Sequence, residues 1–205
     1  MLKALIRNTH RVLVFNRRKH VLVQGLGTFL AGNTDIMDVG TGDGSIARAL
    51  ADQLGDVTIT GIDILVRPHT EIEVTAFDGK TIPNSDKSVD AVTFVDVLHH
   101  CDNPQDLLNE AARVSRNHVV IKDHLAETAF DHLVLRFMDW VGNAPHGVAL
   151  PYEYAPLEVW HTRFREAGLE VEQFTTDLGL YPWPFSLVFG RKLHFLVRLR
   201  HAAGK

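Results

Sequence analysis

Three glycines at every second position form the most chemically suggestive stretch of the chain: Gly40, Gly42 and Gly44. A short apolar run that contains Asp38 precedes them, and a helical pattern starts at Ser45. Glycine accepts a left-handed backbone and lets a ligand approach the main chain closely. Free N–H groups and the positive end of a helix dipole would face whatever lies in the turn. The stretch therefore predicts a strand, a ligand-binding turn and the start of a helix.

The glycine spacing indicates the kind of ligand. A dinucleotide fingerprint has the pattern Gly-x-Gly-x-x-Gly, which this stretch lacks. The acids Asp38 and Asp43 would repel a pyrophosphate, whereas Asp38 would attract an ammonium group. This acid-x-Gly-x-Gly-x-Gly stretch resembles the cofactor loop of class I S-adenosylmethionine-dependent methyltransferases, which wraps the amino-acid part of the cofactor. The alternative is an ordinary glycine-rich turn. The resemblance implies that the following residues contact the cofactor: Asp38, Gly40, Thr41, Gly42 and Gly44.

Acids at the ends of later apolar runs extend this cofactor site. Asp63 stands 19 positions after Gly44, and its carboxylate could accept both hydroxyls of a ribose. The resemblance also implies that Asp78 takes the adenine amino group and that the N–H after it takes a ring nitrogen, although a structural turn explains the glycine there equally well. The remaining cofactor residues that we predict are Ile64 and Gly79, which follow these acids, and Val95 and Asp96, which end the next apolar run.

Histidines at strand ends are the candidates for acid–base catalysis. Methyl transfer to a hydroxyl or an acidic carbon needs a base, and the pKa of histidine lies near working pH. We expect His100 and His124 to do this work, with His146 as the third choice. Each could instead cap backbone groups or line the cofactor. Twelve histidines also raise the question of a metal, but metal-binding motifs such as His-Glu-x-x-His do not occur, so we expect no metal site.

Strands and helices alternate along the chain, which predicts an α/β fold with a doubly wound sheet. The resemblance covers about residues 35–125 by motif, as in the helix that begins at Pro104 after Asn103 as N-cap, and 155–200 by topology. It implies a mostly parallel, seven-stranded Rossmann-like sheet whose last strand runs antiparallel between the fifth and sixth. The expected strands are 36–39, 57–62, 72–77, 89–95, 118–122, 169–175 and 193–199.

The region after the fifth strand should decide the substrate. A helix over about residues 128–141 places one set of side chains on an apolar face: Phe130, Leu133, Val134, Phe137 and Val141. Its polar residues His132, Arg136 and Asp139 lie away from that face. The irregular residues 142–156 predict a lid or substrate loop.

Charge is unevenly distributed along the chain. All 25 acids lie between Asp35 and Asp177, whereas residues 1–34 carry six lysines and arginines and residues 178–205 carry five. The basic ends could contact an anionic surface such as a membrane, or could pack against the acidic body. We expect a basic helical segment over 1–34 and a cofactor-binding domain over 35–205. The acidic body argues against nucleic acid, and a single cysteine with no signal peptide or membrane span favours a cytoplasmic location.

These observations favour a methyltransferase that uses S-adenosylmethionine to modify a small, partly apolar organic acceptor, at oxygen or carbon more than nitrogen. Asp96 to His99 stands where methyltransferases that modify amino groups of nucleic acids and proteins carry Asn/Asp-Pro-Pro-Tyr/Phe. Two alternatives stay open. One is a non-catalytic cofactor-binding protein, for example a subunit at a membrane surface. The other is a nicotinamide-dependent oxidoreductase. The glycine spacing and the presence of Asp38 argue against it.

Overall fold

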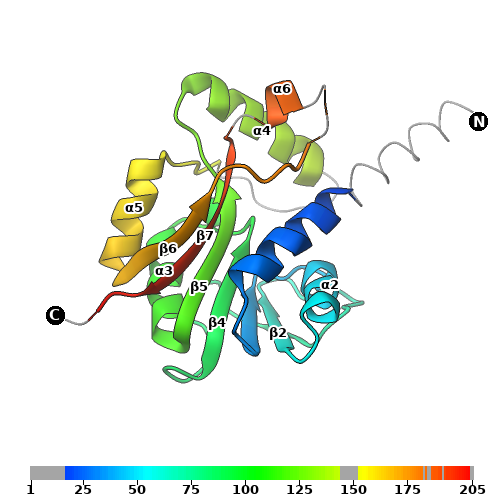
Figure 1. Cartoon of the computed structure of the whole chain (residues 1–205), viewed down its shortest axis with the longest axis vertical. Coiled ribbons are helices and arrows are strands. Elements are labelled where there is room, and N and C mark those ends of the chain that lie inside the picture. The colour runs from blue at the N-terminus through cyan, green and yellow to red at the C-terminus, as the bar shows by residue number, and fades with distance from the viewer. Residues whose placement is uncertain (1–16, 144–151, 182, 184–185, 191, 204–205) are drawn as a thin grey trace, which may run out of the picture.

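A seven-stranded sheet forms the centre of the molecule (Figure 1). The computed structural model describes residues 17–143, 152–181, 183, 186–190 and 192–203. The strand order is β3-β2-β1-β4-β5-β7-β6. β7 pairs antiparallel with both β5 and β6, whereas the other neighbours are parallel. The strands are β1 Asp35–Val39, β2 Thr58–Asp63, β3 Val74–Ala76, β4 Val89–Val95, β5 Ser115–His124, β6 Leu169–Thr175 and β7 His194–His201. The predicted topology, including the inserted antiparallel strand, is confirmed.

Helices cover both faces of this sheet. Residues 17–29 are helical and precede β1. The later helices are α2 Ser45–Leu54, η1 Leu98–His100, α3 Pro104–Val114, α4 Ala129–Asn143, α5 Leu157–Glu166 and α6 Ser186–Phe189. Two short helices, η1 and α6, were not predicted. Asn103 occupies the N-cap position of α3 as expected, but its side chain makes no capping hydrogen bond.

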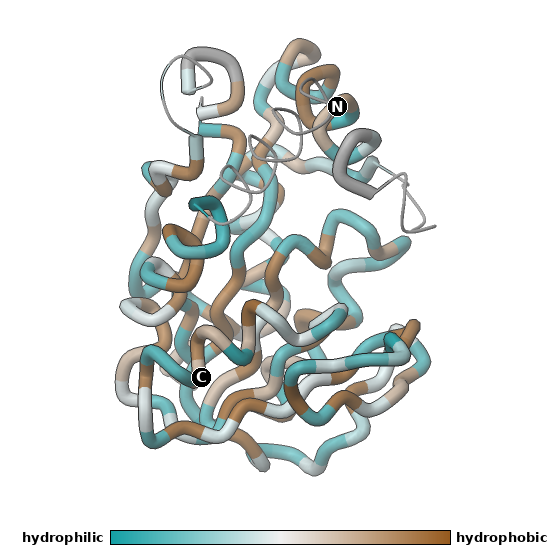
Figure 2. The backbone as a smooth tube through the Cα atoms, turned by 90° about the vertical axis from the view of Figure 1, so that its right-hand side faces the viewer, coloured by the Kyte–Doolittle hydropathy of each residue, from teal (hydrophilic) through white to brown (hydrophobic). Residues whose placement is uncertain are grey.

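Two apolar clusters sandwich the sheet because neighbouring residues of a strand point to opposite faces. Val119 and Ile121 pack with α3 and α5, whereas Val120 packs with α2 and the helix over residues 17–29. Figure 2 shows hydrophobic stretches, in brown, within the backbone tube of the molecule. The same central strands therefore hold helices on both sides, which fixes their ends relative to one another.

The order of the strands reverses between β1 and β4, which is where doubly wound sheets bind ligands. Val39 lies opposite Phe94, and Val95 lies opposite Lys122. The residues that follow these strands therefore reach the same edge of the sheet. This register brings the glycine turn, Asp96 and the end of β5 together.

The helix over residues 17–29 is part of the main core. Leu22, Val23 and Leu26 are buried against a cluster that includes Ile36 and Leu196. Residues 1–16, which make up much of the predicted basic segment, lie outside the described residues. The described part of that segment folds onto the sheet through apolar side chains.

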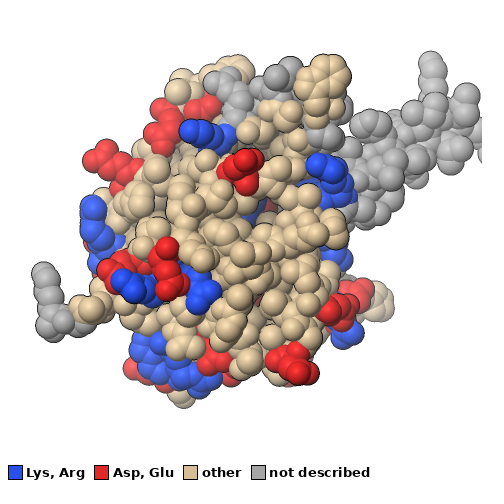
Figure 3. Space-filling view, viewed as in Figure 1, with Lys and Arg blue, Asp and Glu red and all other residues tan. Residues whose placement is uncertain are grey.

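Several bases near the chain ends pair with acids of the body. In β7, Arg198 Nε lies 2.6 Å from a carboxylate oxygen of Glu172, and Arg200 Nε lies 2.8 Å from one of Glu170. Acidic and basic side chains accordingly intermingle over the lower part of β6 and β7 (Figure 3). These pairs follow the second of the two predicted alternatives, in which the ends pack against the acidic body. Contact with a membrane stays a prediction.

The orientation of α4 differs in part from the prediction. Leu133 and Phe137, expected on a buried apolar face, are 64% and 56% exposed. The buried side of the helix carries the acids Asp131 and Asp139 beside Val134, which was expected there, and Leu135. The polar residue Asp139 faces inward because its carboxylate meets partners at the sheet edge, and this outweighs the apolar stripe.

The predicted substrate loop and His146 fall largely outside the described residues, which resume at Tyr152. Among the residues that are described, no helix has the length and apolar character needed to cross a membrane.

Candidate active site

The glycine turn approaches the end of β4 closely. The N–H of Gly40 donates to the carbonyl of Ile62 at 2.8 Å, which ties the turn to β2. Gly40 has a φ of +72°, and a Cβ there would lie 2.6 Å from a methyl carbon of Val97. Only glycine fits this contact without strain. The glycine turn is therefore in direct contact with the residues that follow β4.

Asp38 is buried and holds the turn in place. Its carboxylate accepts hydrogen bonds from the hydroxyls of Thr41 at 2.6 Å and Thr93 at 2.7 Å. Burial raises the pKa of this carboxyl, although both hydroxyls oppose the shift. The side chain thus joins the turn to β4, and its predicted contact with the cofactor stays a prediction.

Asp63 and Asp78 bind backbone N–H groups of nearby loops. Asp63 accepts hydrogen bonds from the N–H groups of Gly42 and Leu65, each at 2.8 Å. Asp78 accepts from the N–H groups of Lys80 at 2.8 Å and Thr81 at 2.7 Å. Both predicted cofactor acids therefore stabilise loops through backbone groups.

Ile64 and Gly79, which each follow one of these acids, approach one another. A Cβ on Gly79 would lie 3.1 Å from a methyl carbon of Ile64, and the side chain of Ile64 is 70% exposed. An apolar side chain held in this position offers a surface on which a flat ring could lie.

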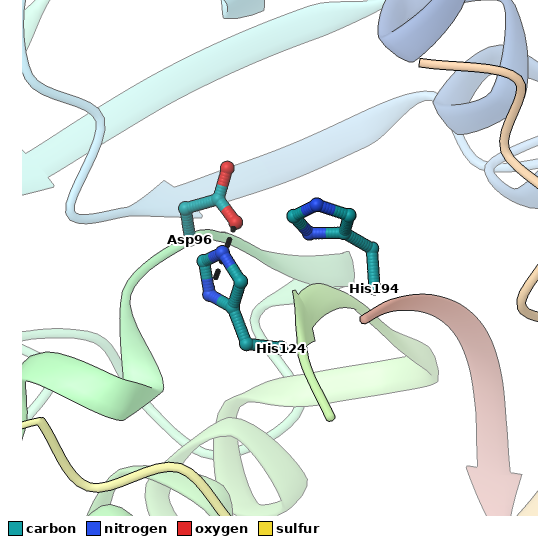
Figure 4. Close-up of side chains that lie close together, drawn as sticks. All are labelled: Asp96, His124 and His194. Carbon is teal, nitrogen blue, oxygen red and sulfur yellow. Dashed lines mark ion pairs between the residues drawn. The ribbon is translucent and has the colours of Figure 1, made fainter. Parts of the chain in front are cut away.

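Asp96, at the end of β4, gathers three cationic or ionisable groups. The fully buried ammonium of Lys122 contacts one carboxylate oxygen, and Arg18 lies 3.2 Å from the other. His124 Nδ1 lies 3.7 Å from the first oxygen, and its ring faces that of His194 (Figure 4). Burial would raise the pKa of Asp96, but Lys122, His124 and Arg18 hold it well below its ordinary value. Asp96 itself has a φ of +57°, a strained backbone for a residue other than glycine.

A second carboxylate, Asp123, organises the histidines. It is fully buried and accepts hydrogen bonds from the N–H of Leu98 at 2.9 Å and of His124 at 2.7 Å. Its distance to His99 Nδ1 is 2.6 Å. His99 Nδ1 also lies 3.2 Å from His124 Nδ1. The two rings from η1 and β5 are thus fixed by one acid.

The other edge of His99 faces α4. Its Nε2 lies 3.4 Å from a carboxylate oxygen of Asp139, which also accepts a hydrogen bond from the hydroxyl of Tyr154. The His100 ring lies 4.0 Å from the His99 ring, measured between centroids. Burial and the nearby His99 lower the pKa of His100 to about 4. Both predicted catalytic histidines therefore belong to one buried polar cluster.

Several members of this cluster were not predicted. His99, Lys122 and Asp123 adjoin predicted site residues at strand ends, so their position in the sequence could have indicated them. Other members come from the helix over residues 17–29, α4, the region after it, and β7, where no motif marks them: Arg18, Asp139, Tyr154 and His194.

The fold and the turn at the strand reversal define a Rossmann-like methyltransferase domain. Residues 3–174 match the family described as Methyltransferase domain, so the chain belongs to this family of class I methyltransferases. The cofactor of the family is S-adenosylmethionine. Comparison with curated proteins finds no match.

Solved structures share the fold at low sequence identity. A complex between the Haloferax volcanii Trm112 methyltransferase activator and the proposed methyltransferase gives a TM-score of 0.68 at 18% identity, covering 98% of this chain and 97% of that one. A Mesorhizobium loti S-adenosylmethionine-dependent methyltransferase gives a TM-score of 0.61 at 18% identity, covering 83% of this chain and 92% of that one. A methyltransferase of the same kind from Aquifex aeolicus gives a TM-score of 0.59 at 19% identity, covering 86% of this chain and 87% of that one.

Proposed function

We propose that this protein transfers the methyl group of S-adenosylmethionine to an oxygen or acidic carbon of a small, partly apolar acceptor. The observation that carries the proposal is the buried cluster of histidines and carboxylates beside the glycine turn. Gly40 of the turn packs against Val97, which directly follows Asp96 of the cluster. Methyl transfer needs the nucleophile and the methyl carbon in line, and a base when the nucleophile carries a proton.

The cofactor would lie across the turn with its sulfonium toward Asp96. The ribose hydroxyls would face Asp63, whose carboxylate closes the turn through Gly42. The adenine would lie on Ile64 beside Gly79 and Asp78. Support for this placement comes from the exposed apolar side chain of Ile64 between two acids that are already positioned by backbone hydrogen bonds.

His124 is the base that the geometry favours, with His100 as the alternative. The acceptor O–H bond would break as its proton passes to the imidazole, the oxygen would attack the methyl carbon, and the S–CH₃ bond would break to release S-adenosylhomocysteine. Asp96 and Asp123 lie 3.7 Å and 3.4 Å from His124 Nδ1 and would stabilise the imidazolium. Tyr154 and Tyr181 supply aromatic surface around the histidines.

The test measures release of S-adenosylhomocysteine with a panel of phenols, enols, carboxylic acids and amines. We expect turnover with hydroxyl or enol acceptors, and a loss of 100-fold or more in His124→Gln because general-base catalysis contributes about 10²–10⁴-fold. His161→Gln, on α5, is the matched control. Calorimetric titration with S-adenosylmethionine should give equal affinity in both variants, and Asp63→Ala should weaken it at least tenfold. Turnover with amines alone would contradict the proposal.

A non-catalytic, membrane-peripheral role is the second candidate. The exposed side chains of Leu133, Phe137 and Trp140 on α4 favour it, since exposed apolar groups of this kind bind membranes or proteins. This role predicts cofactor binding without transfer to any acceptor of the panel, and cosedimentation with anionic vesicles that Phe137→Ser weakens. We propose a cytoplasmic location for the protein in either role.

A further inference from the structure

We propose that His99, His100 and Asp139 form a binding site for a divalent transition-metal ion, with Zn²⁺ as the best match. Each residue offers one ligand atom, and these atoms all lie within 4.8 Å of one another. Two imidazoles and one carboxylate are ligands that Zn²⁺ prefers. The inference goes beyond methyl transfer and is independent of it, because metal binding is measured without cofactor or acceptor.

The distance between His99 and Asp139 suits a shared metal better than a direct bond. His99 Nε2 lies 3.4 Å from the Asp139 oxygen, and among the described residues this nitrogen has no hydrogen-bond partner although the side chain is 1% exposed. Two zinc ligands at about 2.0–2.2 Å and a tetrahedral angle stand about 3.4 Å apart. The two atoms therefore have the separation of one edge of a zinc tetrahedron.

The groups behind the ligands have the arrangement found around metal sites. A metal-binding histidine usually donates its other N–H to a carboxylate, which orients the ring. Here His99 Nδ1 lies 2.6 Å from Asp123, which leaves Nε2 directed at Asp139. Asp123 is itself held by two backbone N–H groups, and Tyr154 holds Asp139.

His100 supplies the third ligand and a route to solvent. Its Nδ1 is buried without a hydrogen-bond partner among the described residues, whereas the residue as a whole is half-buried. Three protein ligands with a fourth position left for water or an oxygen ligand are typical of catalytic zinc sites. No sequence motif marks this set, because Asp139 is about 40 positions from the histidines.

Two neighbouring groups of similar composition do not suit a metal. Between Asp96 and His194, the ammonium of Lys122 contacts the carboxylate and lies 3.4 Å from His194 Nδ1, so a cation already occupies that position. In the group of His99, Asp123 and His124, the 2.6 Å contact is a hydrogen bond and is too short for two ligands of one metal. Only the His99, His100 and Asp139 group is left among the described residues.

The test uses the full chain without a polyhistidine tag, dialysed against a chelator and then freed of it. We expect calorimetry with Zn²⁺ to give one equivalent per chain at micromolar affinity or tighter, and Co²⁺ to give the intense visible absorption of a tetrahedral site. His100→Gln and Asp139→Asn should each weaken Zn²⁺ binding at least tenfold. His69→Gln and His161→Gln, which change histidines outside the cluster, should bind as the unchanged chain does. Circular dichroism and thermal melting show whether each variant is folded.

Three outcomes would overturn the proposal. The first is no Zn²⁺ binding by the folded chain, which would mean that a proton on His99 Nε2 bridges to Asp139 instead. The second is binding that survives both variants, and the third is binding lost in His194→Gln but kept in His100→Gln. None of these outcomes bears on methyl transfer, because S-adenosylmethionine affinity and turnover are measured separately.

Discussion

At the scale of single residues, the site depends on buried charges that neutralise one another. Lys122 has no exposed surface, and its ammonium contacts Asp96, which Arg18 also approaches. Burial lowers the pKa of Lys122, and Asp96 opposes this shift. An unpaired ammonium buried in this position would lower the free energy of unfolding by several kcal/mol, so the burial of Lys122 depends on its pairing with Asp96.

Breaking that pair should be costly, whereas removing both partners should cost less. We expect Lys122→Met to lower the free energy of unfolding by about 3–5 kcal/mol, because it leaves the half-buried carboxylate of Asp96 with Arg18 as its remaining strong cation. Adding Asp96→Asn should recover part of the loss. Urea unfolding of the two single variants and the double variant measures this coupling. Strictly additive losses would show that the two side chains do not act as a pair.

At the scale of elements, the strand ends and the helix that faces them decide which groups meet. β4 and β5 end side by side, so Asp96, Asp123 and His124 come together through sheet register alone. α4 adds Asp139 by turning a polar residue inward and leaving Leu133 exposed. The apolar stripe of α4 predicted that Leu133 would be buried and Asp139 exposed, because helical periodicity carries no information on where a buried polar group has partners.

The two glycines of the turn offer a matched pair of substitutions. Gly40 and Gly42 have φ values of +72° and +63°, so alanine at either costs about 1–2 kcal/mol of backbone strain. At Gly40 the new methyl group would also lie 2.6 Å from Val97, whereas at Gly42 no described atom lies within 4 Å. We expect Gly40→Ala to lower the free energy of unfolding by about 1–3 kcal/mol more than Gly42→Ala. Equal losses in urea unfolding would mean that Val97 moves aside freely.

At the scale of the whole molecule, the chain has a net charge of −4, and two arginines of β7 pair with acids of β6. Asp90 in β4 is one of the acids that hold distant segments together. Its carboxylate accepts hydrogen bonds from the N–H groups of Thr34 and Asp35 and pairs with Arg116 at 3.0 Å. The entry to β1, the start of β4 and the start of β5 are joined at this acid.

This acid should make stability depend on pH. The N–H of Thr34 is the main cause that lowers the pKa of Asp90 from 3.8 to about 2. Its contribution is therefore full above about pH 4 and is lost as the pH falls toward 2, because the folded state then has to take up a proton against these contacts. We expect Asp90→Asn to be less stable by about 1–2 kcal/mol at pH 7, with the difference shrinking below pH 4. Urea midpoints of this variant, the unchanged chain and the Asp56→Asn control measure it, and a difference that stays constant with pH would contradict it.

The sequence by itself determined the elements and the cofactor turn, because both depend on local rules. Glycine spacing, apolar runs and the acids that end them act over a few residues, and they predicted the alternating strands and helices and the strand ends at which Asp96 and His124 lie. The antiparallel direction of the seventh strand and its place between the fifth and sixth came from the family resemblance.

Only the tertiary structure decided which groups complete the polar cluster. Arg18, Asp139 and His194 reach it from three elements that are far apart along the chain. No local pattern marks them, because each is selected by a partner that the folded sheet presents. The same partners orient α4 so that Asp139 is buried beside His99 and Tyr154. The periodicity of apolar residues along the helix does not predict this packing.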